Sequence, residues 1–549
     1  MSPASDQVRL GNFGAARDFT APDQSLLAST GASNPLLAVL CVAIIVAGLV
    51  LRFWSIDSKP IWCDEASTLV SIKEGDGVGI PSQMTTAGQA AHLVKISQPL
   101  NVPVFFQRLK FQRSPNTPLY FFVSRLWAQC FGNTVQSARR LSALISLAQL
   151  PCVFWLAIEL FGCLSVACIC SALCAISPLH LIYAQEARPY SLWTVTVLLG
   201  ALLLLRAWRK NSVGSWWLYA ISQVIAYYTH PASVILTATH GAAILVGGRN
   251  RLVPFLLAAT TAMLACLPWV LGADPARDNM RAFHTWSSTP TVFLDLLKGW
   301  ISAIAVTFFD YNDKSKSWWT IATQSIAAAV GVFSIWYTCR RARAPAPYLL
   351  PILFPGYFLA VAALDFTLGG FKSTVPRYMI PLALGVQIAV AFLLARQFAS
   401  ASKVRRILSF TLAGCLVFSG LSSCLLFSKS KLWWQKQIDP ELTLAQFLNA
   451  DKGTTMWICE RPQTALTAAP LVRPDIPLMI VGDGELVSNP NSYRRIIVSS
   501  GNNSLVERIA AEQGLTAHQC PGTRNGWLLT PDRSAGSKMI EVDLPGTQR

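Results

Sequence analysis

Residues 35–53 read PLLAVLCVAIIVAGLVLRF, an apolar run whose one charged residue, Arg52, stands next to its end. A helix needs about 20 such residues to cross about 30 Å of hydrocarbon. Similar runs recur as far as Phe427 and stop beyond Lys429. Of the 549 residues, 52% are hydrophobic and 13% are charged, which is more apolar surface than one soluble core buries. The sequence therefore predicts an all-α polytopic membrane protein.

Hydropathy predicts about eleven transmembrane helices, with thirteen as the upper limit. The expected spans are 35–53, 140–161, 164–182, 190–207, 214–230, 231–247, 252–272, 318–338, 348–366, 377–395 and 407–427. Two further apolar pieces, Pro118 to Phe131 and Leu294 to Phe309, contain Arg125 and Lys298. With only about 15 residues each, they are expected to be half-embedded helices in loops outside the cytoplasm.

The charge distribution predicts which side each loop occupies. The chain has 45 Lys and Arg against 28 Asp and Glu, a net charge of +17. In a membrane protein the positive-inside rule explains such an excess, so no nucleic-acid partner is expected. We take the following clusters as cytoplasmic: 206–210, 249–251, 340–343 and 396–406. The remaining loops then lie outside: 54–139, the 185–188 turn, 273–317, 367–376 and the chain after 430.

The chain divides into three parts on this pattern. Residues 1–34 are polar and are expected to be a disordered cytoplasmic tail without a cleaved signal. Residues 35–429 are expected to form the transmembrane domain, in which 54–139 is the first outer loop, and 430–549 are expected to form a small extracytoplasmic α/β domain with strand-like and helix-like runs. Most of the 14 cysteines lie in apolar runs, whereas Cys459 and Cys520 lie in the C-terminal part. In an oxidising compartment these two could form a disulfide.

An acidic pair follows the first span, in the stretch Trp62-Cys63-Asp64-Glu65-Ala66. One interpretation is structural: Asp64 caps a helix and Glu65 interacts with its dipole. The other is chemical. A carboxylate held partly desolvated at a membrane surface can act as a general base, because burial raises its pKa toward the working pH.

A polar turn between two spans, 177–190, contains Tyr183, Glu186, Arg188 and Tyr190. Such groups are costly near hydrocarbon, so they indicate a functional site, although a snorkelling Glu–Arg pair at the interface is the alternative.

Two further polar positions are expected on the same face: His230, and the basic pair Lys372 and Arg377. A lone histidine is more often a hydrogen-bonded structural residue, and the basic pair could be interface anchors. The fork of donors on Arg and the compact charge of Lys also suit phosphate. Convergence on one face favours a site with acids and phosphate-binding cations.

Several motifs resemble one family by their order and spacing over about residues 35 to 400. They are 62–66, Thr117-Pro118-Leu119-Tyr120, Ala138-Arg139-Arg140-Leu141-Ser142-Ala143-Leu144, 177–190 and Arg377-Tyr378-Met379-Ile380-Pro381. The chain is similar to membrane glycosyltransferases of the GT-C fold, specifically glycosyltransferase family 39. That family includes protein O-mannosyltransferases and the lipid A aminoarabinose transferase.

The resemblance implies a polyprenyl-phosphate sugar donor used on the exoplasmic face of a bacterial-type plasma membrane, with inversion at the anomeric carbon. It implies that Asp64, beside Glu65, is the base, that Glu186 is a second acid and that Arg377 meets the donor phosphate. Arg139, in the third motif, is expected to bind substrate together with Arg188, Lys372, Tyr183, Tyr190 and His230. No soluble cofactor is expected, no metal-ligand signature is present, and assistance by a divalent metal stays open. Cys63 and Asn116-Thr117-Pro118 depart from the family pattern, so the acceptor stays undefined.

Two other functions fit the same pattern. A transporter or flippase of a lipid-linked sugar also needs polar residues at membrane depth, but it often shows paired broken helices in pseudo-symmetric halves. A non-catalytic scaffold with the same fold would not need the acidic residues.

Overall fold

The computed structural model describes residues 35–74, 83–96, 99–111, 117–271, 291–313, 317–433, 439–450, 455–481, 495–521, 523 and 525–531. The chain forms two compact units, one of residues 1–59 and 100–434 and the other of residues 60–99 and 435–549. We call them the membrane unit and the sheet unit. The predicted tail, 1–34, lies outside the described residues.

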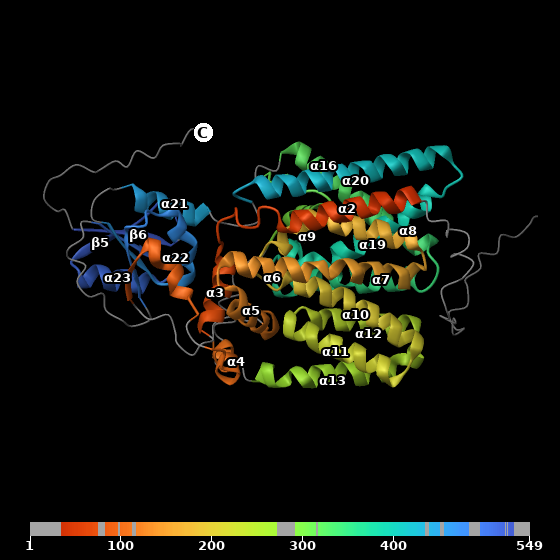
Figure 1. Cartoon of the computed structure of the whole chain (residues 1–549), viewed down its shortest axis with the longest axis horizontal. Helices are drawn as coiled ribbons and strands as arrows, with labels where there is room; N and C mark the ends of the chain where they lie inside the picture. The colour runs from red at the N-terminus through yellow and green to blue at the C-terminus, as the bar shows by residue number, and fades with distance from the viewer. Residues whose placement is uncertain are drawn as a thin grey trace, which may run out of the picture. The chain divides into compact units, whose positions relative to one another are not determined.

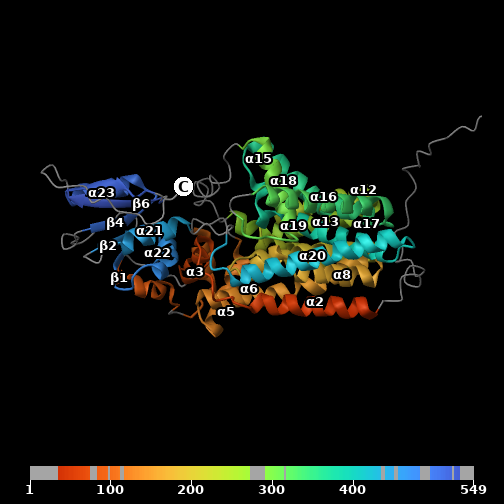
Figure 2. The same ribbon diagram turned by 90° about the horizontal axis from the view of Figure 1, so that it is seen from above.

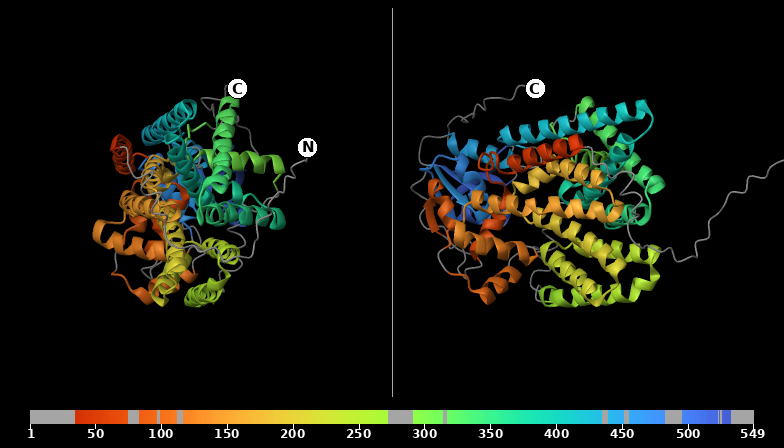
Figure 3. Two further views of the ribbon diagram at one scale, coloured as in Figure 1. Left: turned by 90° about the vertical axis from the view of Figure 1, so that its right-hand side faces the viewer. Right: turned by 45° about the vertical axis from the view of Figure 1, so that its right-hand side comes forward.

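The membrane unit is a bundle of helices that run roughly alongside one another (Figure 1). Its main helices are α2 (Pro35–Phe53), α6 (Val135–Leu147), α7 (Gln149–Phe161), α8 (Leu164–Ala175), α9 (Pro178–Ala184), α10 (Tyr190–Lys210), α11 (Val213–Thr229), α12 (Ser233–Gly247), α13 (Leu252–Leu271), α16 (Trp318–Arg341), α17 (Ala346–Leu353), α18 (Pro355–Leu368), α19 (Ile380–Phe398) and α20 (Lys403–Lys429). Shorter elements are α4 (Val102–Phe111), α5 (Pro118–Phe131), α15 (Phe293–Ala305), η2 (Arg249–Arg251), η5 (Lys372–Thr374) and η6 (Pro376–Met379). The yellow and lime helices α11, α12 and α13 form one group in the right-hand view of Figure 3.

Every one of the eleven predicted spans is helical. Within the described ranges, 8 helices are long and apolar enough to cross a membrane, or 9 if the bent pair α8 and α9 is one span. That count takes apolar helices of at least 18 residues. It leaves out α11, which has 17 residues, and α12, which has 15. The half-embedded candidates α5 and α15 have 14 and 13 residues and are too short to cross. The chain is an integral multi-pass membrane protein, as predicted.

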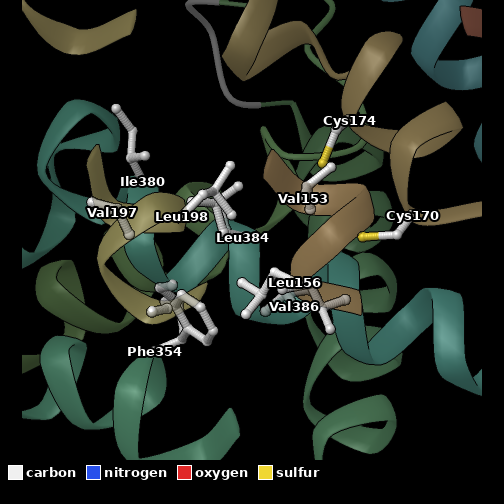
Figure 4. Close-up of a cluster of buried hydrophobic side chains, with 14 of the residues drawn as sticks. Val153, Leu156, Cys170, Cys174, Val197, Leu198, Phe354, Ile380, Leu384 and Val386 are labelled. Carbon is white, nitrogen blue, oxygen red and sulfur yellow. The ribbon is translucent and has the colours of Figure 1, made fainter. Parts of the chain in front are cut away.

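α19 lies at the centre of the membrane unit. It packs against α8, α16 and α20, and its span is 89% buried, against 17% for α16. A helix that is apolar all round suits such a position. Gly385 lets α19 approach Phe354, because a Cβ at 385 would lie 2.4 Å from the Phe354 Cβ. Figure 4 shows this core, with Leu384 and Val386 of α19 among Leu156 and Val197.

A 57° bend separates α8 from α9 at Pro178, and an arginine stabilises it. Arg52, at the end of α2, is fully buried and donates to the carbonyls of Ala175, at 2.8 Å, and Cys174, at 3.4 Å. These carbonyls end α8, where the helical hydrogen bonding is interrupted. After α9, the Gln185 amide donates to backbone carbonyls at the end of α2, two of them at 2.9 Å. The turn that follows α9 is therefore fixed against α2.

In its described residues, the sheet unit has six strands in the order β1-β3-β2-β4-β6-β5. They are β1 (Gln83–Thr86), β2 (Thr455–Cys459), β3 (Pro477–Ile480), β4 (Arg495–Ser499), β5 (Leu515–Gln519) and β6 (Gly526–Pro531). β2 is parallel to β3 and β4, and the other pairs are antiparallel. Alternate strand residues form two cores, one with α21 (Asp439–Asn449) and α22 (Pro462–Ala468), the other with α23 (Asn503–Glu512). Figure 2 shows the helices against the strands. The predicted C-terminal α/β structure is confirmed.

The sheet unit also takes in residues 60–99, which we expected in a loop of the membrane domain. β1 pairs with β3, with Gln83 opposite Ile480, and η1 (Ala87–Val94) contributes to the same core. A four-residue strand of sequence QMTT has no hydrophobic alternation, and its partner lies almost 400 positions away. Cys459 and Cys520 are both buried free thiols.

Candidate active site

The polar turn between α9 and α10 contains two buried charged groups. Glu186 is 2% exposed and Arg188 is 5% exposed. The turn is tight, since the Arg188 N–H donates to the Glu186 carbonyl at 2.7 Å. Tyr183 and Tyr190 stand on either side of it with ring centroids 5.0 Å apart, and the Arg188 guanidinium lies 5.9 Å from the Tyr190 ring. Buried ionisable groups at a helix end in a membrane protein favour a functional site.

His230, between α11 and α12, adjoins this turn. Its ring stacks on Trp193 at 4.0 Å and lies 6.2 Å from the Tyr190 ring. The backbone N–H of Ala232 donates to His230 Nδ1 at 3.2 Å, so a neutral ring carries its proton on Nε2.

Arg377, far away in the sequence, joins the same group. Its guanidinium lies 5.4 Å from the Tyr378 ring, which is 6.1 Å from the His230 ring. The charges of Glu186 and Arg377 both act on the Tyr183 hydroxyl. The structure therefore brings together Tyr183, Glu186, Arg188, Tyr190, His230 and Arg377, all predicted from the sequence. Lys372 lies in the segment that leads to Arg377, and both are half-buried.

This group, which we call the cation–carboxylate cluster, lies at one end of the helices. Tyr190 begins α10, and its 21 residues place Lys210 about 30 Å away. At that far end, Arg206 and Arg209 both pair with Glu159 of α7. The cluster predicted as cytoplasmic, 206–210, and the polar turn thus lie at opposite ends of one helix.

Arg139 lies in the membrane unit but makes a different kind of contact. It is fully buried in α6 and donates to the carbonyls of Ile56, at 3.1 Å, and Lys59, at 2.9 Å. These bonds hold the chain that follows α2, so Arg139 stabilises that stretch of backbone.

Asp64 and Glu65 lie in the sheet unit, in the first turn of α3 (Cys63–Glu74), which packs against α22. The Cys63 thiol donates weakly to Asp64 Oδ1 at 3.8 Å, and the Thr68 hydroxyl donates to the Asp64 carbonyl at 3.3 Å. Asp64 is half-buried and Glu65 fully buried. Because α3 begins at Cys63, Asp64 is inside the helix, and the capping interpretation does not fit.

Sequence reasoning missed Trp193, which forms the stacking wall for His230. It lies inside an apolar span, where an aromatic residue normally packs in the core and gives no signal. Among the described residues, no group of three or more His, Cys, Asp or Glu side chains is placed to hold a metal ion.

Residues 115–271 match the family described as dolichyl-phosphate-mannose-protein mannosyltransferase. The match includes the polar turn and His230. Among curated proteins, none matches the chain. The solved structures similar to this chain include two of ArnT from Cupriavidus metallidurans. The form bound to undecaprenyl phosphate has a TM-score of 0.52 and 14% identity, covering 90% of this chain and 99% of that one. The apo form has the same score and identity, covering 89% and 97%.

At 14% identity, the similarity to ArnT is evidence for the fold. The family match is independent of it and falls on the part of the chain that holds most of the cation–carboxylate cluster. The predicted resemblance to membrane glycosyltransferases of the GT-C fold is therefore confirmed.

Proposed function

We propose that this protein transfers a sugar from a polyprenyl-phosphate donor to an acceptor outside the cytoplasm, with inversion at the anomeric carbon. The observation that carries the proposal is the cation–carboxylate cluster, which places two guanidinium groups and a carboxylate at one end of the membrane helices. The family matched by residues 115–271 is described as using dolichyl-phosphate-mannose, and the ArnT structure holds undecaprenyl phosphate. Both support a lipid-phosphate donor.

We assign three cations of the membrane unit, Arg377, Arg188 and Lys372, to binding of the donor phosphate. Arg377 and Arg188 each offer a planar fork of donors, and Lys372 adds a compact charge. When the sugar leaves, negative charge grows on the lipid phosphate, and fixed cations stabilise that charge. The rings of Tyr183, Tyr190 and His230 supply apolar faces and polar edges suited to a sugar.

We assign the role of general base to Asp64. The acceptor oxygen or nitrogen forms a bond to the anomeric carbon while the bond from that carbon to the phosphate oxygen breaks. The acceptor proton goes to Asp64, and the bonding electron pair leaves with the lipid phosphate. Glu65 and Glu186 are assigned as further acidic residues that orient substrate. No step needs a nucleotide, and dependence on a divalent metal is tested by adding a chelator.

We assign the reaction to the exoplasmic face of a bacterial-type plasma membrane. The polar turn lies at the opposite end of α10 from Arg206, Arg209 and Lys210. Since basic clusters mark the cytoplasmic side, the cation–carboxylate cluster is assigned to the outer side.

The proposal is tested with purified protein in liposomes and a radiolabelled polyprenyl-phosphate sugar. Acceptor is supplied as an extract of extracytoplasmic glycans, lipids and proteins. We expect label to move into the acceptor and free polyprenyl phosphate to appear in equal amount. Movement of the labelled lipid across the bilayer without transfer would indicate a flippase. An unchanged donor would indicate a scaffold.

A further inference from the structure

The segment between α18 and α19, which carries Lys372 and Arg377, is held by an acid inside the preceding helix. Asp365 is 5% exposed and lies one turn before the end of α18. Its Oδ1 accepts the backbone N–H of Lys372 at 3.0 Å, and its Oδ2 accepts the N–H of Ser373 at 2.6 Å. Both oxygens of one carboxylate therefore fix the backbone at Lys372.

A second anchor comes from α15. Trp300 Nε1 donates to the Ser373 hydroxyl at 2.8 Å. Next to it, a Cβ placed on Gly299 would lie 2.4 Å from the Thr374 Cβ, so the α15 backbone lies directly on the segment. Two elements separated in sequence thus hold the same short turn.

The turn is closed by hydrogen bonds within its own backbone, without these anchors. The Val375 N–H donates to the Lys372 carbonyl, and the Tyr378 N–H donates to the Val375 carbonyl. A carboxylate near the end of an apolar span is costly, and charge-assisted bonds to N–H groups offset the cost. The bonds from Asp365 add rigidity to a segment whose side chains carry positive charge. Cations carried on a rigid backbone lose less freedom when they bind an anion.

We infer that Asp365 is a positioning residue that holds Lys372 and Arg377 in the arrangement that binds the donor phosphate, with Trp300 as its second anchor. The inference rests on the proposed function, because it specifies how that site recognises phosphate. Asp365 itself is assigned no contact with substrate.

The test compares undecaprenyl phosphate with undecaprenol, which has the same tail without the phosphate, as ligands of the full-length protein in detergent. Asp365→Asn keeps the size of the side chain but turns an amide donor toward an N–H group. We expect its dissociation constant for undecaprenyl phosphate to rise about ten-fold, because binding must then supply the free energy of ordering the segment, which the charge-assisted bonds supply in the wild type. Affinity for undecaprenol should stay unchanged, because only the phosphate depends on the segment. A variant whose fold is generally disturbed would bind both ligands more weakly.

Hydrogen exchange provides a readout on the anchored atoms. In Asp365→Asn, the amides of Lys372 and Ser373 should exchange at least about ten-fold faster than in the wild type. Asp295→Asn is the matched control, because Asp295 is exposed on α15 and pairs only weakly with Lys298 at 3.3 Å. It should change neither binding nor exchange.

Trp300→Phe keeps the test valid if Asp365→Asn does not fold. It keeps the ring contact with Phe358 at 5.4 Å and removes the bond to Ser373. It should weaken phosphate binding about three-fold, near the lower end for one neutral hydrogen bond. A folded Asp365→Asn protein with wild-type phosphate preference or wild-type exchange overturns the inference alone. A wild-type protein that does not prefer the phosphate over the alcohol overturns the inference and the proposed function together.

Discussion

Replacing Asp64 with Asn separates a general base from a structural carboxylate. The side chain keeps its size but no longer accepts a proton, so turnover should fall by about 10² to 10⁴, or roughly 2.7 to 5.4 kcal/mol of barrier. The structural loss should be smaller. Asp64 lies half-buried in the first turn of α3, where the interaction of a carboxylate with the helix dipole contributes about 0.3 to 1 kcal/mol.

The assay measures sugar transfer in liposomes together with thermal unfolding of the same preparations. Asp57→Asn is the matched control, because Asp57 is an exposed carboxylate whose ion pair with Arg140, at 3.1 Å, lies on the surface. It should transfer sugar at the wild-type rate. Glu65→Gln has a different expected result: Glu65 is fully buried, so a loss of stability should accompany any loss of activity. An Asp64→Asn protein that unfolds normally and transfers sugar at the unmodified rate would refute the assignment.

Three further results are expected. Arg377→Ala should weaken donor use roughly ten- to a hundred-fold, the effect of losing a charge-assisted contact, and Arg377→Lys should recover only part; an unchanged donor KM would make it an interface anchor. Cysteines at the exposed positions Ala401 and Ala511 should react with impermeant reagents from opposite sides of the membrane, and labelling from the same side would contradict the topology. Burial raises the pKa of the Cys459 thiol to about 11, so alkylation should stay slow at pH 8 and speed up on unfolding; equally fast alkylation of the folded protein would show that it is accessible.

Much of the site could be predicted from the sequence, because charged residues are rare in the apolar part of this chain. Glu186, Arg188 and Arg377 stand out against spans that otherwise contain almost none, since each costs free energy near hydrocarbon. Trp193 could not be found that way, because an aromatic residue in a span resembles ordinary core. We predicted no role for Asp365, although it lies inside a predicted span, because its contact with the Lys372 backbone depends on how α18 ends.

The sequence by itself determined the membrane class, the helical segments and the strand-like and helix-like runs of the C-terminal part. Those features follow from local hydropathy and from side-chain periodicity, which any stretch displays without its partners. Only the tertiary structure decided that residues 60–99 join the sheet, because β1 is specified by pairing with β3 far along the chain. It likewise decided that Arg377 and His230 share one cluster, since helix packing selects which helix ends meet and no local pattern encodes that choice.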